Sequence, residues 1–510
     1  MRSFYLNIVF ALCSISASLA QGKQHILFRI IDTDSKRAVP YATVRFANSK
    51  NGVVANILGD FRIPIKYKKK NDTLILSCIG YSTKRVALNN IIDRDYHIIY
   101  LVPKTEQLSE VVVNGNKEKE LSAKQIVRKA IENIKINNPV EPFSYIAYYR
   151  DYQFVEEEYI NLNEGIVEVF DEGFSTHKIS DPLNTTALYS YKLNTDFSQD
   201  TLLTNSPYND SKQIRDGKMG SSISNELTLL DIHNPIRNYN TGSFSFVYIL
   251  EKDFIKNHKL YKKGSIFLDD EELYKIEFIA KKDITGYTYE ANGFIYISKD
   301  DFSIHRFDYK LYSNSPKKLI FTVDIEYKRK ENGKMYLNYI TFNNNFFITQ
   351  NDALKIENWE YSKDRNSFFI EFNRVLDVRS IEKINNVKLF FKDKKLAIRN
   401  LYFVSPKMIR VRFQKETSDF LNQQNLEEIA LTSIKLKNFR GSRGFTMRES
   451  KVEGYQFREL FIQRVFINKT SSSDLLYVKK GKSLKDAPIN DFNTKDYWLN
   501  SPLKQTKGNN

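Results

Sequence analysis

The chain has 510 residues, of which 77 are Lys or Arg and 61 are Asp or Glu, so its formal charge at pH 7 is +16. A hydrophobic fraction of 41% and an aromatic fraction of 14% exclude a disordered or fibrous chain. The basic residues are spread along the whole sequence, which argues against nucleic-acid binding. Two interpretations of this charge stay open, a solvated surface and weak attraction to anionic lipid or polysaccharide.

Residues 1–20 have the features of a signal peptide. Arg2 supplies the basic start, residues 4–13 are mainly apolar, and residues 18–20 offer small side chains to signal peptidase, so we predict cleavage before Gln21. No later stretch approaches the ~18 apolar residues of a membrane helix. We therefore expect an exported protein that is periplasmic or associated with the outer membrane.

Residues 21–104 are predicted to form a small antiparallel β-sandwich. The strands alternate in hydrophobicity, are rich in β-branched residues, and are separated by turn pairs such as Asn51-Gly52. Once residues 1–20 are removed, Cys78 is the single thiol, so we expect no disulfide, including one to a partner. Its apolar neighbours indicate an inert core residue. The expected strands are 26–32, 42–47, 59–65, 73–79, 83–88 and 96–101.

Three motifs in this sandwich, at residues 40–44 (PYATV), 59–63 (GDFRI) and 79–83 (IGYST), carry a family resemblance. They resemble the carboxypeptidase regulatory-like domain, a transthyretin-like β-sandwich of cell-envelope proteins. Residues 108–113 (LSEVVV) resemble the segment that follows this domain in TonB-dependent outer-membrane transporters. The resemblance implies an accessory module and no peptidase, because none of the six His residues has the Glu three positions later that a zinc carboxypeptidase needs.

Residues 105–140 are predicted to be a polar linker followed by one amphipathic helix. Ser122 is the expected N-cap, and the sequence Asn137-Asn138-Pro139 ends the helix. The helix has one apolar stripe, which either packs on a neighbouring domain or docks a partner. The stripe consists of Ile126, Val127, Ala130, Ile131 and Ile134.

Residues 141–362 are predicted to form a large curved antiparallel sheet that is half-barrel-like. Asn292-Gly293 and Asn332-Gly333 are typical of hairpin turns, and residues 181–240 are expected to contain long loops. The run from Tyr274 to Arg306 is similar to the half-barrel sheets of periplasmic lipoprotein-carrier-like proteins. The expected strands are 143–149, 159–170, 244–250, 264–268, 274–280, 293–298, 303–309, 319–327 and 334–342.

The last part of the chain contains two further predicted segments. Residues 367–374, 409–413 and 434–438 resemble the strands of a bacterial immunoglobulin-like domain. We place this inserted β-sandwich at residues 363–445. Residues 446–510 are then expected to pack back on the sheet as a C-terminal segment. The fold class is therefore mainly β throughout.

No motif of a serine hydrolase, a nucleotide-binding protein or a zinc enzyme occurs in the sequence. We therefore predict no catalytic, cofactor-binding or metal-ligating residues and no cofactor, although an unrecognised hydrolase stays open. The acidic runs 269–272 and 300–301 favour turns over a Ca²⁺ site. Glu164 and Glu168, like residues 156–158, are weak candidates for an acid–base pair. His305 suits a half-buried sheet position, and neither His177 nor His233 has a visible partner.

These observations favour a non-catalytic protein of the cell envelope that acts as a docking scaffold or binding module. We expect an envelope or outer-membrane protein as partner, as the resemblance to proteins of TonB-dependent systems implies. Exposed strand edges of the sandwich would suit strand addition by that partner. The alternative is a periplasmic carrier that holds a lipid or another apolar ligand in a half-barrel cavity. Lipid or polysaccharide therefore remains a second class of partner.

Overall fold

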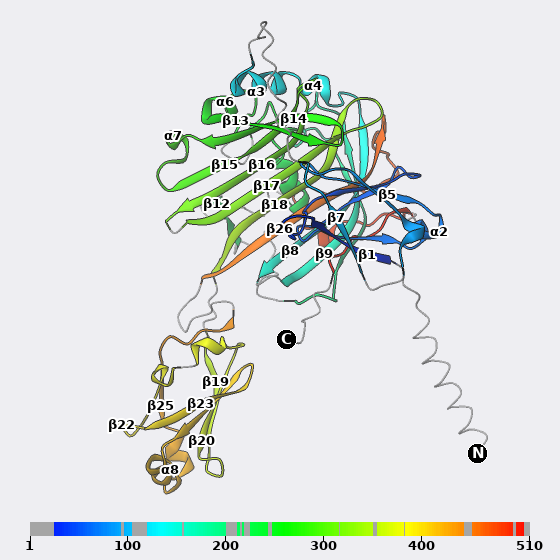
Figure 1. The fold of residues 1–510 in the computed structure, drawn as a ribbon. Helices are drawn as coiled ribbons and strands as arrows, with labels where there is room; N and C mark the ends of the chain where they lie inside the picture. The colour runs from blue at the N-terminus through cyan, green and yellow to red at the C-terminus, as the bar shows by residue number, and fades with distance from the viewer. Residues whose placement is uncertain are drawn as a thin grey trace, which may run out of the picture. The chain divides into compact units, whose positions relative to one another are not determined.

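The fold is seen in a computed structural model of the chain (Figure 1). It describes residues 25–503 except 93–95, 105–119, 156–157, 200–211, 215–216, 219–224, 243–246, 316, 350–353, 382, 443–450 and 493–495. The predicted signal peptide and residues 108–113 lie outside the described residues. The chain divides into two compact units. The first comprises Met1–Tyr208, Gly220–Asn345 and Tyr455–Asn510, and the second comprises Asn209–Met219 and Phe346–Gly454.

The first unit begins with a β-sandwich of two sheets. One has the strand order β4-β1-β7 and the other β3-β2-β5-β6. Inward side chains such as Phe28, Val44 and Leu74 are fully buried between them. The prediction of a wholly antiparallel sandwich is wrong in one place, because β7 pairs with β1 in parallel after the chain has formed the other sheet. The elements are β1 His25–Asp32, β2 Thr43–Phe46, β3 Gly52–Val54, β4 Asp60–Pro64, α2 Lys66–Lys69, β5 Thr73–Ser77, β6 Lys84–Ala87, η1 Leu88–Asn90 and β7 His97–Leu101.

The predicted linker helix is present as α3 (Ala123–Glu132), followed by the single turn α4 (Ile134–Asn137). Ser122 caps α3 in a capping box, in which its hydroxyl accepts from the Gln125 amide and the Gln125 side chain accepts from the Ser122 amide. The apolar stripe is buried in the core of the large sheet. Of the two roles left open by the sequence, the stripe therefore serves core packing.

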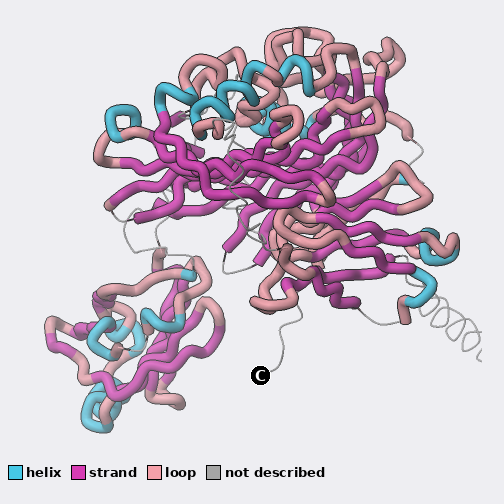
Figure 2. Tube along the Cα trace, turned by 45° about the horizontal axis from the view of Figure 1, so that its top comes forward, coloured by secondary structure: helices cyan, strands magenta, loops and turns pink. Residues whose placement is uncertain are grey.

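The large sheet contains ten strands in the order β10-β9-β8-β26-β18-β17-β16-β15-β14-β13, and β11 and β12 pair off this path. Its strands are long, and bulges in several of the pairs bend it. The curved antiparallel sheet predicted from the sequence is confirmed (Figure 2). Its strands are β8 Phe143–Val155, β9 Glu158–Asp171, β10 Thr186–Leu193, β11 Lys212–Ile214, β12 Gly217–Lys218, β13 His258–Leu268, β14 Glu271–Ala280, β15 Tyr289–Ser298, β16 Ile304–Asn314, β17 Lys317–Arg329, β18 Met335–Thr349 and β26 Lys451–Ile467.

Three details of the sheet differ from the sequence prediction. Asn292-Gly293 lies inside β15 instead of in a turn, and a side chain at Gly293 would place its Cβ 1.9 Å from the Asp308 carbonyl oxygen. Glycine is therefore needed there for close strand approach. Residues 247–250 form turns and no strand. The closing segment begins with β26, which lies within the sheet between β8 and β18 and not on top of it.

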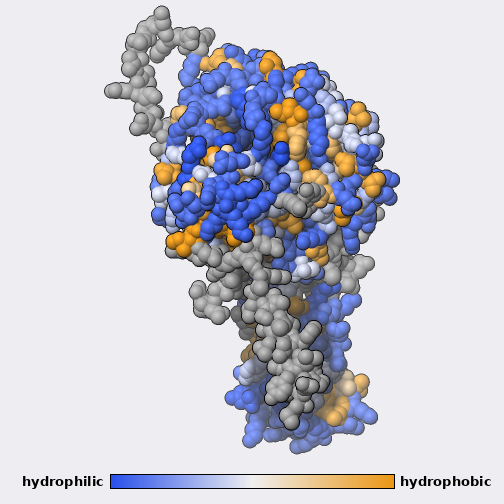
Figure 3. Space-filling model, turned by 90° about the vertical axis from the view of Figure 1, so that its right-hand side faces the viewer, coloured by the Kyte–Doolittle hydropathy of each residue, from blue (hydrophilic) through white to orange (hydrophobic). Residues whose placement is uncertain are grey.

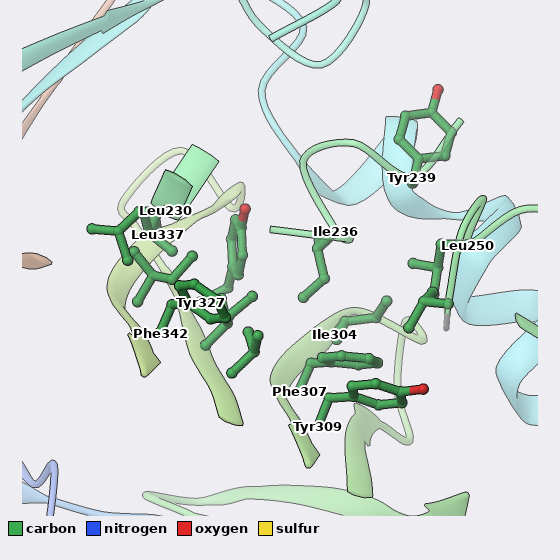
Figure 4. Packing of buried hydrophobic residues seen from close by; sticks show 14 of the residues in the cluster. Leu230, Ile236, Tyr239, Leu250, Ile304, Phe307, Tyr309, Tyr327, Leu337 and Phe342 are labelled. Carbon is green, nitrogen blue, oxygen red and sulfur yellow. The ribbon is translucent and has the colours of Figure 1, made fainter. Parts of the chain in front are cut away.

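The concave face of the sheet holds the main hydrophobic core. Aromatic and aliphatic side chains from β16, β17 and β18 face residues of the connecting segments, as Ile304 and Phe307 face Ile236 and Leu250 in Figure 4. Figure 1 shows α3, α4 and α6 along the top of this sheet. The region 181–240, expected as loops, also contributes β10 and a helix to this packing. The additional helices are α5 Glu226–Ile232, α6 Phe254–Asn257, α7 Lys282–Thr285 and η5 Leu484–Asp486.

The second unit contains two sheets, of order β19-β20-β24-β23 and β22-β21-β25. Phe368, Ile370 and Val411 are fully buried on the inner side of the first sheet, and Leu389 is fully buried on the second. Two small sheets agree with the expected inserted β-sandwich, but it begins before residue 363, because β19 pairs with β20 and lies in this unit instead of in the curved sheet. Its elements are β19 Ile356–Ser362, β20 Ser367–Phe372, η2 Val378–Ser380, η3 Ile384–Asn386, β21 Val387–Phe391, β22 Lys394–Lys395, β23 Ile398–Ser405, β24 Met408–Phe413, α8 Lys415–Asn422, α9 Leu426–Ile429 and β25 Ser433–Leu436.

Candidate functional site

The N-terminal sandwich lies directly on the convex face of the large sheet. The Thr43 hydroxyl donates to Glu326 Oε1 over 3.3 Å and accepts from Asn338 Nδ2 over 2.8 Å. Lys328 Nζ donates to the Ser77 hydroxyl over 3.0 Å. All five side chains are buried. Buried polar groups of this kind are stable only when they are paired, so they fix the position of the sandwich on the sheet.

A fully buried ion pair lies in the centre of the same face. Arg150 Nε donates to Glu459 Oε2 over 2.5 Å, and neither side chain has any exposed surface. The Tyr152 hydroxyl also donates to this carboxylate, over 3.2 Å. The rings of Tyr148, Tyr152, Tyr159 and Phe461 lie 5.2–5.8 Å from the Arg150 guanidinium carbon. The rings offset part of the hydration that the guanidinium has lost on burial.

The C-terminal segment holds the sandwich from its other side. Trp498 is 5% exposed and belongs to the sandwich core, where its Nε1 donates to the Arg62 carbonyl over 2.7 Å. Asn500 accepts from the Arg62 amide over 2.8 Å and donates to the Val54 carbonyl over 3.0 Å. Gln463 of β26 donates to the Trp498 carbonyl over 2.7 Å. The tail therefore links the large sheet to the sandwich.

A groove of about 760 Å³ opens between the sandwich and the sheet. Its walls come from β2, the loop that follows β2, the end of β17 and the second half of β26. The lining contains basic, polar and apolar residues. The basic residues are Arg45, Lys50, Lys328, Arg329 and Lys330, and the only acidic residue in the lining is Glu331.

The cations of the groove differ in how they are compensated. Arg329 is paired with Glu271 at 3.0 Å and with Asp301 at 2.8 Å. Lys50 is 3.3 Å from Glu331, and both are well exposed. Lys330 has no hydrogen bond or ion pair through its side chain with the residues that the structure describes. Burial, with the nearby positive charges of Lys328 and Arg45, lowers the pKa of Lys330 to about 8.

A second, smaller hollow of about 530 Å³ adjoins this groove and brings together the two acidic runs singled out in the sequence. Glu271 Oε1 lies 3.2 Å from His305 Nε2 and 3.0 Å from the Arg329 guanidinium. Burial would raise the pKa of Glu271, but hydrogen bonds from His305 and Arg329 lower it to about 2. The Thr83 hydroxyl donates to Asp269 over 2.5 Å. Glu271, Asp269 and Asp301 are thus paired with other residues of the chain. Asp269 joins the sandwich to the β13–β14 turn, and Asp301 joins the β15–β16 turn to β17.

Glu164 and Glu168, weighed as an acid–base pair, are both buried on β9 and separately occupied. Glu164 accepts from the hydroxyl of Tyr148 and from Asn194. Glu168 accepts from Tyr189 over 2.5 Å. Two residues four positions apart on one strand are ~13 Å apart, which is too far for a shared substrate atom. Residues 156–157 lie outside the described residues.

The histidines and the thiol occupy structural positions. His233 is buried, its Nδ1 lies 2.7 Å from the Leu229 carbonyl oxygen, and burial lowers its pKa to about 3. His177 Nδ1 accepts from the Ser180 amide over 3.2 Å. His305 is only 2% exposed, and so is more deeply buried than expected. Burial raises the pKa of Cys78 to about 12, which agrees with an inert core residue. Within the described residues, no group of three or more His, Cys, Asp or Glu side chains is placed to hold a metal ion.

The outer face of the sandwich presents exposed apolar side chains. On β7, Ile98 and Tyr100 are 46% and 43% exposed, and the flanking Tyr96 and Val102 are 46% and 54% exposed. Ile99, between them, is 5% exposed because it points into the core. The adjacent β1 alternates in the same way. We call Tyr96, Ile98, Tyr100 and Val102 the β7 stripe.

The N-terminal sandwich matches a known domain family. Residues 29–113 match the model of the family described as CarboxypepD_reg-like domain. These residues are a carboxypeptidase regulatory-like domain. The motifs at residues 40–44, 59–63 and 79–83 all lie within the match, so the resemblance seen in the sequence is confirmed. The regulatory-like domain is thus the module that packs on the convex face and carries the β7 stripe.

Comparisons of the whole chain with curated proteins and with solved structures give weaker results. A search of curated proteins finds no match to the chain. A LolA superfamily protein from Nitrosomonas europaea is 15% identical with a TM-score of 0.19, and the alignment covers 44% of this chain and 86% of that one. An outer membrane lipoprotein-sorting protein domain from Vibrio parahaemolyticus is 10% identical with a TM-score of 0.21, covering 42% and 84%. TM-scores of this size establish neither a shared fold nor a shared function.

Sequence reasoning missed the groove. Arg45 belongs to the regulatory-like domain, whereas Lys328 and Lys330 belong to β17 and the turn after it. Only the fold brings these cations together, and scattered lysines in a basic chain gave no signal for it. The alternation of Glu326, Lys328 and Lys330 along one strand face was the one local hint. Among the described residues, no helix is long and apolar enough to cross a membrane.

Proposed function

We propose that the protein is an exported, non-catalytic scaffold of the cell envelope that binds a partner protein through the outer face of its regulatory-like domain. The observation that carries this proposal is the β7 stripe. Four large apolar side chains on one face of one edge strand, each more than 40% exposed, are unusual for a surface that only meets water. The other sheet of the domain is covered by the convex face, so the stripe lies on the side left for a partner.

The contact we propose is made by side chains and not by strand addition. Lys84 Nζ donates to the Tyr100 carbonyl over 2.9 Å, and the Ser82 amide donates to the Val102 carbonyl over 2.9 Å. These bonds occupy backbone acceptors on the side of β7 that an added strand would use. Aromatic and aliphatic side chains of this size are the usual anchors of protein interfaces.

The non-catalytic part of the proposal is supported by the polar groups of the structure. Glu164, Glu168 and Glu271 are each engaged by two or more side chains of the protein itself. A catalytic acid or base must be able to reach a substrate atom. The periplasmic or outer-membrane-associated location rests on the signal-peptide features of residues 1–20 and remains part of the proposal.

The experiment is a comparison of complexes extracted from the envelope without denaturant. Mature wild-type protein is compared with the double variant Ile98→Asp/Tyr100→Asp and with the control Tyr287→Asp, which changes a residue that is 88% exposed elsewhere on the surface. We expect one envelope protein in stoichiometric amount with wild type and with the control, and its loss from the double variant. An identical set of companions for all three proteins would contradict the proposal.

A second candidate is a carrier of a lipid or other apolar ligand. The concave face favours it, because aromatic and aliphatic side chains cover that face from β14 to β18. In the present structure those side chains pack against α3, α5 and α6, so a carrier would have to displace these helices to take up a ligand. Mass spectrometry of lipids in the same extract distinguishes the carrier from the scaffold. A stoichiometric lipid without a protein companion would favour the carrier.

A further inference from the structure

The groove between the regulatory-like domain and the large sheet has the dimensions of a ligand site. Its volume of about 760 Å³ lies within the ~300–1,000 Å³ typical of small-molecule pockets. It is lined by two surfaces that were far apart in the sequence and are fixed by buried polar contacts, among them Thr43 with Glu326. A pre-formed pocket with fixed walls spares a ligand much of the cost of ordering its site.

The chemistry of the lining favours an anion. Lys328, Lys330 and Arg45 meet at one end, and the pKa values of Lys328 and Lys330 are both lowered by burial and by their positive neighbours. Lys328 has the Ser77 hydroxyl as its hydrogen-bond partner, and Arg45 has a loose contact of 3.7 Å with Asp269. Lys330 has no side-chain partner among the described residues. Mutually repelling cations in one pocket are stabilised when an anion binds among them.

The remainder of the lining indicates a larger ligand than a bare ion. Asn48 and Ser49 add polar groups beside the cations. Ile75, the cross-strand neighbour of Arg45, and Ile467, which is 41% exposed, add apolar surface to the lining. A tetrahedral oxyanion with several acceptor oxygens matches a group of Lys and Arg donors better than a planar carboxylate with two oxygens does.

We propose that this groove binds a phosphate-bearing ligand, with the phosphate among Arg45, Lys328 and Lys330 and the organic part along Ile75 and Ile467. The phosphate comes either from a soluble phosphate ester or from a lipid headgroup. This site is independent of the proposed partner surface, because the β7 stripe lies on the other sheet of the regulatory-like domain. Either proposal can therefore fail without the other.

The test is isothermal titration calorimetry of the mature full-length protein with inorganic phosphate, glycerol 3-phosphate, glycerol and acetate. Vesicles of phosphatidylglycerol and of phosphatidylcholine are compared in a sedimentation assay. We expect glycerol 3-phosphate or phosphatidylglycerol to bind, and glycerol, acetate and phosphatidylcholine not to. Binding of the soluble ester alone identifies a soluble ligand, and binding of the vesicles alone identifies a lipid headgroup. No binding of any phosphate compound, or equal binding of acetate, would overturn the proposal.

A pair of charge-matched variants distinguishes phosphate binding in the groove from attraction by the general positive charge of the protein. Lys330→Gln should weaken phosphate binding by about tenfold, because one charge-assisted contact is lost. Lys310→Gln removes the same charge from an exposed position on β16 that does not line the groove, and should change affinity less than about twofold. Equal effects of the two substitutions on ester or vesicle binding would show that the groove is not the site.

Two further measurements, the unfolding temperature and the pH dependence of affinity, test whether the variant folds and whether Lys330 itself takes part in binding. Without ligand, Lys330→Gln should unfold at the same or a higher temperature than wild type, since it removes an uncompensated charge. Because the pKa of Lys330 is about 8, with burial, Lys328 and Arg45 lowering it and Glu331 raising it, affinity in wild type should fall by about tenfold between pH 7 and pH 9.5. Lys330→Gln should abolish most of this fall, and a fall of the same size in the variant would contradict the assignment.

Discussion

The two faces of the ten-stranded sheet make different kinds of contact. On the concave face, the ring of Phe278 stacks with those of Phe307 and Tyr309 at 5.2 and 5.6 Å in a cluster of apolar side chains. On the convex face, Tyr41 and Val54 of the regulatory-like domain pack on apolar residues of the sheet, and the buried hydrogen bond from Thr43 to Glu326 joins the two. Hydrophobic burial has no preferred direction, whereas a buried hydrogen bond requires a defined geometry. The difference teaches that the concave face stabilises the sheet, while the convex face determines where the regulatory-like domain lies. Seen from the side shown in Figure 3, the surface is mainly hydrophilic with separate hydrophobic patches.

The largest effect should come from breaking the buried ion pair. Arg150→Met leaves the Glu459 carboxylate uncompensated among aromatic rings, so we expect the free energy of unfolding to fall by about 3–5 kcal/mol. Urea denaturation followed by tryptophan fluorescence measures it. The double variant Arg150→Met/Glu459→Leu should recover most of the loss, because both charges are then absent. A single variant as stable as wild type would show that the pair contributes little.

The tail links the large sheet to the regulatory-like domain. Trp498→Ala opens a cavity in the core of the regulatory-like domain and removes the hydrogen bond to Arg62, so we expect a loss of about 3 kcal/mol. Limited proteolysis should then cut the domain before the sheet. Trp498→Phe, which keeps a ring in place, should lose less. Unchanged proteolysis in the alanine variant would mean that the convex contacts suffice without the tail.

A pH titration tests a charge cluster at the end of β9. Burial would raise the pKa of Asp171, but Lys178 and Arg237, 3.2 and 2.9 Å away, hold it at about 2. A folded-state pKa below the unfolded value contributes stability that is present above pH ~4 and is lost as the pH falls through about 2, here about 2 kcal/mol. Urea titrations from pH 5 to pH 2 measure this loss. Asp171→Asn should show a shallower pH dependence, and identical slopes would contradict the assignment.

The smallest effect should come from trimming the concave core. Ile325 is fully buried on β17, and Ile325→Val removes one methylene from an apolar environment that can relax around it. We expect a loss of about 1 kcal/mol in the free energy of unfolding, without any change in the position of the regulatory-like domain. A loss as large as that of Arg150→Met would mean that the two faces do not differ as described.

Local signals in the sequence predicted the parts of the fold that local chemistry decides. Ser122 with Gln125 predicted the start of α3, and Asn332-Gly333 predicted the β17–β18 turn, where Gly333 has a φ of 75°. Asn292-Gly293 carries the same turn signal but lies within a strand, because the crowding of Asp308 and Phe278 demands a glycine. A tertiary constraint there overrode the local preference.

The candidate sites depended on contacts that no local pattern records. The parallel pairing of β7 with β1, which exposes the β7 stripe, requires the chain to leave one sheet and return to it. The groove combines Arg45 with Lys330, and the position of β26 inside the sheet adds Gln463 and Ile467 to its lining. The acidic runs at residues 269–272 and 300–301 were recognised, but their joint pairing with Arg329 was visible only after folding.

Native mass spectrometry of the protein extracted from envelope membranes tests the central claim most directly. The account predicts a complex of the chain with one protein partner, dissociated by Ile98→Asp/Tyr100→Asp, and an apolar interior that carries no ligand. A free chain with one lipid bound in its concave core, in wild type and in the double variant alike, would contradict it.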